Sequence, residues 1–342
     1  MNKKNWLLVL LAFVFTVTTF SSCKKSDSDT DKSDEWFQKA AFKGPVTSSA
    51  ASFLINNIAY ITTGATTNAA GKTAYIKDTY AYDAASDTWS EKAAFPGEAR
   101  IGAVGFAIGN VGYVGAGNNG TDNLSDFYKF DMSSNTWTQI ASLPIAVNGA
   151  VAFTVNGVGY VGTGSTTTAS SGKKNTTAFY KYNASSNTWE TIADIPYTEK
   201  PNAAFSFVVN NVAYVGGGST AGGAAIKDFY KFDPSKENPW TKLNDLNRSD
   251  DSYTYSLARS NASAFVINGT PFVVGGSNGS VINTTWKYNV GGDYWTNDNG
   301  VFAGPARKDA IGFAVGNNGY ITTGINGSST RYDDTWMFTP IY

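Results

Sequence analysis

Residues 102–117, GAVGFAIGNVGYVGAG, contain two short apolar runs separated by Gly109-Asn110. Asn and Gly tolerate the positive φ angles that tight hairpin turns require, so this stretch predicts two antiparallel strands. Residues 149–164, GAVAFTVNGVGYVGTG, repeat the pattern. An aromatic-rich segment follows, as in residues 126–131, DFYKFD, and a Trp-containing segment comes after it. Each unit therefore predicts a sheet of four antiparallel strands.

The unit is repeated along the chain. Its second strand ends on glycine six times, with an aromatic residue four positions earlier in each case. These glycines are Gly64, Gly117, Gly164, Gly218, Gly276 and Gly324. The late tryptophans are separated by 53, 48, 52, 51 and 55 residues, and they are Trp36, Trp89, Trp137, Trp189, Trp240 and Trp295. A period near 50 residues with four strands per unit is typical of a β-propeller blade.

The glycine ending, the aromatic before it and the late Trp resemble the Kelch repeat over residues 36–342. The family's paired glycine survives only at residues 217–218 and 275–276, and Thr or Ala takes the first place elsewhere. The resemblance implies an all-β fold, a six-bladed β-propeller of four-stranded antiparallel blades.

The two ends of the chain predict how the ring closes. The last unit stops at residues 334–342, DTWMFTPIY, after its third strand. The missing fourth strand has a counterpart at the start, because residues 36–42, WFQKAAF, parallel residues 89–95, WSEKAAF. We therefore expect residues 36–42 to complete the sixth blade, which removes an open sheet edge and favours a monomer.

The first 35 residues predict where the protein is located in the cell. Two lysines precede an apolar stretch at residues 6–20, which is too short for a spanning helix of about 20 residues and fits a signal peptide. Residues 20–23, FSSC, resemble a bacterial lipobox, which makes 1–22 a lipoprotein signal peptide and Cys23 the lipid attachment site. An ordinary signal peptide with an incidental Cys23 is the alternative. Residues 23–35 are polar and predict a flexible tether. Lys24 after the cysteine favours anchoring at the outer membrane or cell surface. Anchoring on the periplasmic side is the alternative.

Composition excludes several function classes. Lys and Arg number 26 against 27 Asp and Glu, a balance that does not suit nucleic-acid binding. The chain has no histidine and one cysteine, so it lacks His-based nucleophilic triads and His or thiolate metal sites. The copper chemistry of galactose oxidase, a Kelch propeller, is therefore excluded, and no cofactor or metal is expected.

Three arginines predict a binding site on the face that carries the most variable loops. Arg100, Arg259 and Arg307 stand six residues before a first-strand Phe, and the other units have Thr47, Val147 and Glu199 at that place by this spacing. Guanidinium groups favour carboxylate or sulfate, hence acidic sugars or carboxylate-bearing peptides. The alternative is that they bond neighbouring loops, as the Kelch resemblance implies.

A long loop at residues 244–262 offers a second site. It holds Tyr253 and Tyr255 beside Asp250 and Asp251. Aromatic rings flanked by carboxylates are suited to stacking on a sugar and hydrogen bonding to it. Packing of the two tyrosines within the loop is the alternative.

The expected function is non-catalytic binding of a glycan or an extracellular protein. Sialic acid mutarotase, another Kelch propeller, suggests an alternative, a cofactor-free sugar mutarotase or epimerase in which Glu98 or Glu199 acts as acid or base beside the arginines. A third possibility is a structural hub in an envelope assembly.

Overall fold

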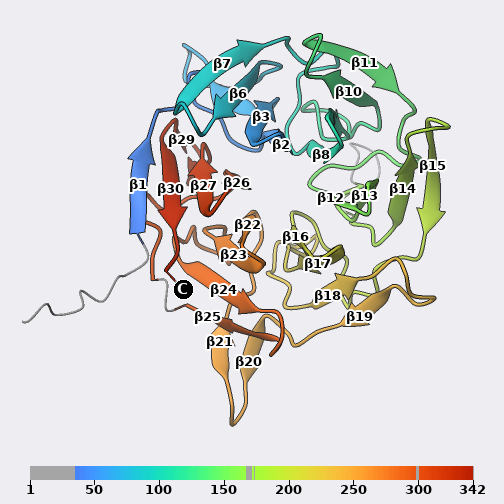
Figure 1. Ribbon diagram of the computed structural model, residues 1–342, viewed down its shortest axis with the longest axis vertical. Coiled ribbons are helices and arrows are strands. Elements are labelled where there is room, and N and C mark those ends of the chain that lie inside the picture. The colour runs from blue at the N-terminus through green and yellow to red at the C-terminus, as the bar shows by residue number, and fades with distance from the viewer. Residues whose placement is uncertain (1–34, 167–171, 173, 298–299, 342) are drawn as a thin grey trace, which may run out of the picture. The chain divides into compact units, whose positions relative to one another are not determined.

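A computed structural model describes residues 35–166, 172, 174–297 and 300–341, and these form an all-β ring around a central channel (Figure 1). The described residues make six four-stranded antiparallel sheets and three two-stranded hairpins. None of them lies in a helix long and apolar enough to cross a membrane. The expected six-bladed β-propeller is confirmed.

Each blade runs from an inner to an outer strand. Blade 1 contains β2 (Ala51–Ile55), β3 (Ile58–Thr62), β6 (Thr79–Asp83) and β7 (Thr88–Lys92). Blade 2 contains β8 (Val104–Ile108), β9 (Val111–Gly115), β10 (Phe127–Asp131) and β11 (Thr136–Ile140). Blade 3 contains β12 (Val151–Val155), β13 (Val158–Gly162), β14 (Phe179–Asn183) and β15 (Thr188–Ile192).

The other half of the ring follows the same order. Blade 4 contains β16 (Phe205–Val209), β17 (Val212–Gly216), β18 (Phe229–Phe232) and β19 (Trp240–Lys242). Blade 5 contains β22 (Ser263–Ile267), β23 (Thr270–Val274), β24 (Thr285–Asn289) and β25 (Tyr294–Thr296). Blade 6 contains β26 (Ile311–Val315), β27 (Asn318–Thr322), β30 (Thr335–Thr339) and β1 (Glu35–Lys39). The hairpins are β4–β5 (Ala65–Thr67, Thr73–Tyr75), β20–β21 (Asn247–Ser249, Thr254–Ser256) and β28–β29 (Ile325–Asn326, Thr330–Arg331).

The N-terminal strand closes the ring, as the sequence predicts. β1 pairs antiparallel with β30, and Trp36 lies opposite Phe338 (Figure 1). The Trp36 ring packs on Phe302 and Phe338 with centroid separations of 4.7 and 4.8 Å. β1 begins at Glu35, one residue earlier than expected. The last blade is therefore completed by the first described strand.

One stacked aromatic pair lies between the first and second strands of every blade. In blade 2, Phe106 stacks on Tyr113 with centroids 5.0 Å apart and planes 6° from parallel. The pairs of the other blades are Phe53–Tyr60, Phe153–Tyr160, Phe207–Tyr214, Phe265–Phe272 and Phe313–Tyr320. A glycine of the next blade makes room for the ring, since a Cβ on Gly159 would lie 2.1 Å from Phe106. These pairs fill the seams between blades.

A closed circle of backbone hydrogen bonds surrounds the channel. One residue just before the first strand of each blade donates its N–H to the carbonyl of the equivalent residue in the preceding blade, at 2.8 to 3.0 Å. All six adopt positive φ, between 54° and 61°. These residues, the axial ring, are Ser49, Gly102, Gly149, Ala203, Asn261 and Asp309. Because Ser49 donates to Asp309, the circle has no free end.

The late tryptophans fasten the blades at the outer rim. Trp137 Nε1 donates to the carbonyl of Ala93 in the preceding blade at 2.9 Å, and Ala93 N donates to Asn135 Oδ1 at 3.0 Å. Three further tryptophans make the equivalent bond to a carbonyl of the preceding blade, namely Trp89, Trp189 and Trp240. The fourth strand is therefore joined to its neighbour by polar contacts as well as packing.

The propeller has two distinct faces. We call the one with the two-residue turns between first and second strands the turn face. The other, the loop face, carries the loops between second and third strands and the connections between blades. Glu35 pairs with Thr339 at the turn-face ends of β1 and β30, so both ends of the propeller leave from the turn face.

Deletion of residues 36–42 is expected to open the ring, because β30 and the ring of Phe338 lose their cover. Loss of one large buried aromatic alone costs about 3–5 kcal/mol, and the exposed β30 edge favours self-association. Thermal unfolding and light scattering during gel filtration would measure both effects against a chain that begins at Ser33. A deletion variant that stays monomeric with an unchanged melting temperature would contradict this account of closure.

Candidate functional site

Two of the predicted arginines are enclosed by protein. Arg100 donates through Nη1 and Nη2 to the two carboxylate oxygens of Asp126, at 2.6 and 2.8 Å. Arg307 donates in the same way to Asp334, at 2.5 and 2.8 Å. The arginines are only 0% and 2% exposed, and their other bonds go to backbone carbonyls of the loop face. Both therefore brace the loops within their own blades.

Arg259 of blade 5 is equally buried but has no carboxylate partner. Its guanidinium donates to the carbonyls of Leu257 and Gly275 and, at 3.1 Å, to Thr284 Oγ1. Thr284 occupies the place that Asp334 takes in blade 6, since each accepts a hydrogen bond from the indole of a Trp two residues later. Burial without a counter-charge lowers the pKa of Arg259 to about 9.

Blade 4 contains the carboxylate without the arginine. The Phe that stacks on the second strand of this blade is Phe207, so the residue equivalent to Arg100 is Pro201. Counting from Phe205 instead aligned Glu199 with the arginines, and that alignment was therefore wrong. Gly164 N donates to the carbonyl of Pro201 at 3.0 Å, as Gly64 N does to the carbonyl of Arg100. The arginines therefore come from blades 2, 5 and 6 only.

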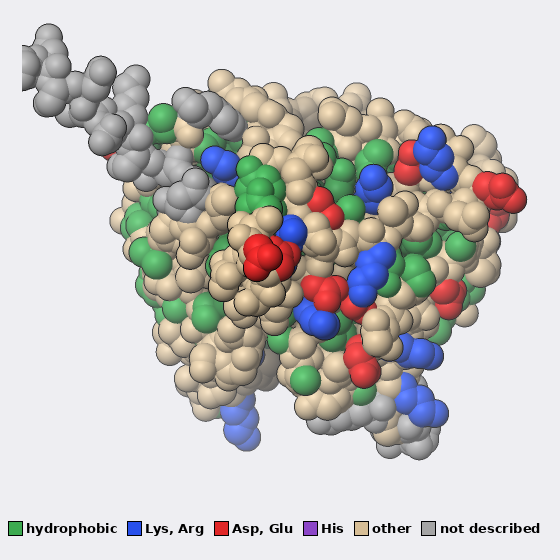
Figure 2. Space-filling view, turned by 90° about the horizontal axis from the view of Figure 1, so that it is seen from below, with side chains coloured by type: hydrophobic (Ala, Val, Ile, Leu, Met, Phe, Trp, Pro, Cys, Tyr) green, Lys and Arg blue, Asp and Glu red, His purple; other side chains and the backbone are tan. Residues whose placement is uncertain are grey.

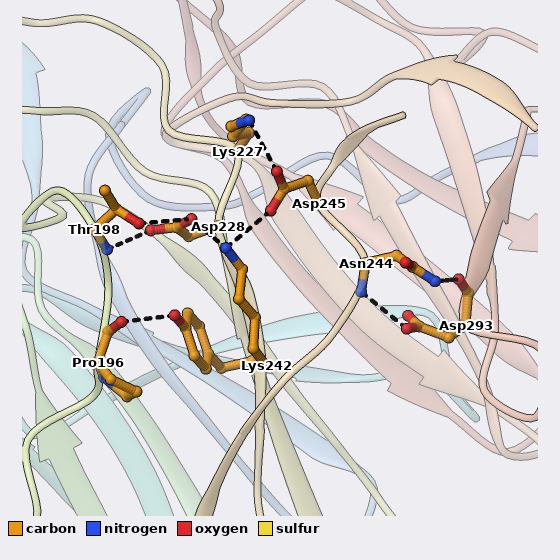
Figure 3. Close-up of polar contacts among 9 residues, drawn as sticks. Pro196, Thr198, Lys227, Asp228, Lys242, Asn244, Asp245 and Asp293 are labelled. Carbon is orange, nitrogen blue, oxygen red and sulfur yellow. Dashed lines mark hydrogen bonds and ion pairs between the residues drawn. The ribbon is translucent and has the colours of Figure 1, made fainter. Parts of the chain in front are cut away.

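The carboxylate of blade 4 is Asp228, which is buried (Figure 3). It accepts a hydrogen bond from Thr198 N at 2.6 Å and lies 3.5 Å from Lys242 Nζ. Lys242 also contacts Asp245 at 3.4 Å, and these two carboxylates raise its pKa against the opposing effect of burial. The charged groups of this cluster therefore bind one another and the backbone of neighbouring loops.

The two tyrosines of the long loop lie in and beside β20–β21, which projects from the ring (Figure 1). Tyr253 stacks on Tyr294 with centroids 4.4 Å apart, and the Arg248 guanidinium covers it at 4.8 Å. Tyr255 is buried and edges onto Trp286. Arg248 pairs with Asp250. Both rings therefore pack on blade 5, against residues outside the loop, whereas the alternative stated from the sequence was packing within the loop.

The surface on this side carries no single-sign patch. Figure 2 shows Lys and Arg side chains interspersed with Asp and Glu and separated by uncharged surface. Large apolar side chains are exposed at only three described positions, Phe37, Leu54 and Val301.

The two candidate acid/base residues are exposed and lie apart. Glu98 Oε2 accepts a hydrogen bond from Asn119 Nδ2 at 2.6 Å. Glu199 lines a cavity of about 680 Å³ between the loops of blades 3 and 4, where Lys174 and Lys200 also lie. Glu98 meets the buried guanidinium of Arg100 through its backbone carbonyl, which accepts a hydrogen bond from Nε at 2.8 Å.

The loop face contains a cavity that the sequence interpretation did not single out. It measures about 760 Å³ and lies over blades 2, 3 and 4. Five asparagines line it together with Ser, Thr, Gly, Ala and one Ile, and none of the described residues that line it is charged or aromatic. The asparagines are Asn118, Asn123, Asn148, Asn175 and Asn202. We call this cavity the amide pocket.

Hydrogen bonds hold several of these amides in place. Asn123 Oδ1 accepts from Asn118 Nδ2 at 2.9 Å and from Asn148 Nδ2 at 2.8 Å. Asn123 Nδ2 donates across the seam to the carbonyl of Ser165, at 2.7 Å, in blade 3. Asn202 Oδ1 is buried without a hydrogen-bond partner. The sequence signal for the pocket was the polar residue after the strand-ending glycine, as in Asn118 and Ser165.

A second cavity of about 380 Å³ lies on the channel axis and is bounded by the axial ring. Ile101, Asn148 and Asn202 line both cavities, so the two spaces adjoin each other. Asp309 lines the axial cavity, and Asn261 Nδ2 donates to its Oδ1 at 2.6 Å. Burial raises the pKa of this carboxyl, against the opposing effects of Asn261 and Lys308.

The described residues contain no group of three or more His, Cys, Asp or Glu side chains that could hold a metal ion. Cys23 lies outside the described residues, as does most of the predicted tether.

Comparison with known proteins supports the fold. Residues 100–144 and 258–297 match the Kelch motif. The solved structure of YjhT superposes with a TM-score of 0.71, over 87% of this chain and 95% of that chain, at 18% sequence identity. At that identity the likeness concerns fold alone. No curated protein matches the sequence significantly.

The substitution Thr284→Asp is expected to stabilise the protein at neutral pH by about 1–3 kcal/mol, because it supplies Arg259 with the missing carboxylate. The folded-state pKa of Arg259 is about 9, below its ordinary value, so the cost of burying its charge is fully present below that pH. Chemical denaturation at pH 7 would measure the gain.

The matched control is Thr284→Asn, which has nearly the same shape but no charge. Equal or lower stability of Thr284→Asp relative to Thr284→Asn would show that Arg259 gains nothing from a carboxylate.

Proposed function

We propose that this Kelch-repeat β-propeller is a binding module for a neutral, hydroxyl-rich ligand of the saccharide class, held in the amide pocket. The observation that carries the proposal is the lining of that pocket, in which the described residues supply amides and hydroxyls from three successive blades and no charged side chain. A carboxamide both donates and accepts hydrogen bonds, as a sugar hydroxyl does. The volume of about 760 Å³ suits a small ligand.

The chemistry of the pocket favours a neutral ligand over an acidic one. The three arginines that suggested acidic sugars are 0–2% exposed and bonded within their blades. A protein partner is less well supported, because binding energy in protein interfaces concentrates in aromatic and Arg side chains, and the pocket has neither. We therefore place the ligand among neutral glycans.

A cofactor-free mutarotase or epimerase is the second candidate. It is supported by one observation, that the cavity containing Glu199 adjoins the amide pocket and shares Asn175, Thr220 and Ala221 with it. A saccharide in the amide pocket would lie close to that carboxylate. Glu98 lines neither cavity.

We also propose that the mature protein is anchored by a lipid at Cys23, at the outer membrane or cell surface. The proposal rests on the signal-peptide pattern and the lipobox-like residues 20–23, FSSC. It places a glycan-binding module where extracellular glycans are met.

Saturation-transfer NMR with malto-, cello-, manno- and galactotetraose is expected to show contact with at least one of these neutral sugars. Asn148→Ala and Asn202→Ala should each weaken that binding about 5- to 10-fold, since a hydrogen bond contributes about 1 kcal/mol. Asn110→Ala, on the turn face, is the matched control and should leave affinity unchanged.

Absence of contact with every sugar, together with binding of an envelope protein, would replace the proposal with a protein partner. The same samples report anomer exchange. If the wild-type protein accelerates anomer exchange and this acceleration disappears in Glu199→Gln or in Glu98→Gln, the protein is a catalyst and not only a binding module.

Cys23→Ser is expected to release the protein from the membrane fraction and to abolish metabolic labelling by a fatty-acid analogue. Ser22→Ala keeps a small residue before the cysteine and should leave both unchanged. Continued labelling of Cys23→Ser would refute the anchor.

A further inference from the structure

The axial ring is uneven in its side chains. In blades 2, 3 and 4 its members are Gly102, Gly149 and Ala203, which add at most a methyl group. In blades 5, 6 and 1 its members carry polar groups, namely Asn261, Asp309 and Ser49. The axial cavity therefore adjoins the amide pocket on its small-residue side, and side-chain oxygens line its opposite wall.

Asp309 is not required by the fold. The circle of hydrogen bonds uses backbone N–H and carbonyl groups alone, and four other residue types, Ser, Gly, Ala and Asn, satisfy it in the other five blades. A partly buried carboxylate costs free energy that a small neutral residue would avoid. Asp309 is also the only charged side chain among the described residues that line the amide pocket or the axial cavity. These facts point to a role in contacting a ligand.

The channel narrows below the axial ring. The cavities measure about 760, 380 and 190 Å³ from the loop face inward. One alanine from each blade lines both of the deeper cavities, and these are Ala50, Ala103, Ala150, Ala204, Ala262 and Ala310. The space of about 190 Å³ below the axial ring is small compared with the amide pocket, which suits the end of a chain better than a chain passing through.

We propose that the terminal unit of the saccharide enters the axial cavity, where Asp309 accepts hydrogen bonds from its hydroxyl groups. This inference rests on the proposed function of the amide pocket. Asn261 holds one carboxylate oxygen through its Nδ2, at 2.6 Å, so the group is oriented before the ligand arrives. A carboxylate offers about four acceptor positions, of which the bonds from Asn261 and from the Ser49 side chain use two. The protein would then recognise chain ends and reject chain interiors.

The test uses the tetrasaccharide of the panel that binds, with and without a benzyl group at its reducing or non-reducing end. Calorimetry should show that wild-type protein accepts the benzyl group at one end only. Asp309→Ala should weaken binding of the free tetrasaccharide about 10- to 100-fold, as expected for hydrogen bonds to a charged group. Ala150→Leu should block the axial cavity and have a similar effect.

Two controls separate folding from recognition. Lys129→Gln removes an exposed charge that lines neither cavity and should leave affinity unchanged. Asp309→Asn keeps one acceptor oxygen and should bind better than Asp309→Ala, with a melting temperature near wild type.

The outcomes distinguish the two proposals. Suppose that the tetrasaccharide binds and that Asn148→Ala weakens its binding, but that Asp309→Ala and a benzyl group at either end leave its affinity unchanged. Chain-end recognition is then wrong, whereas binding in the amide pocket is supported. If no saccharide binds at all, both proposals fail.

Discussion

The closed circle of six backbone hydrogen bonds around the channel is the constraint on which the rest of the molecule depends. Each bond requires its residue to adopt a φ of 54° to 61° and to face the equivalent residue of the next blade. That requirement sets where every first strand begins, and hence where each stacked aromatic pair packs against the next blade. Four of the six late tryptophans add a hydrogen bond between neighbouring blades at the outer rim. Ring closure by β1 then gives the sixth blade its fourth strand.

The repeat made the architecture predictable because every blade is built from the same pattern of strands, turns and aromatic residues. Two apolar strands, a positive-φ turn and a glycine at a fixed place give the same stacked pair six times, so one irregular unit does not obscure the pattern. Closure was also predictable, since residues 36–42 copy a fourth strand found elsewhere in the chain. Both inferences used local pattern and repetition, which a sequence carries directly.

The site was less predictable because spacing fixes a position but not what surrounds the side chain. The carboxylate partners of Arg100 and Arg307 lie 26 and 27 residues later in the chain, so no local sequence pattern predicts these ion pairs. Counting from Phe205 also placed Glu199 where Pro201 stands, because blade 4 has a Phe at two alternate positions. The amide pocket escaped notice for a different reason. Asparagine is common in turns, so its gathering over blades 2 to 4 became visible only once the loops had been placed beside one another.

The position of the chain ends has a consequence for how the protein presents itself. β1 starts and β30 finishes on the turn face, while the amide pocket opens on the loop face. A group fused directly to the start of β1 or to the end of β30 therefore joins the propeller on the face opposite the entrance of the amide pocket. Such a fusion leaves the pocket entrance accessible to solutes.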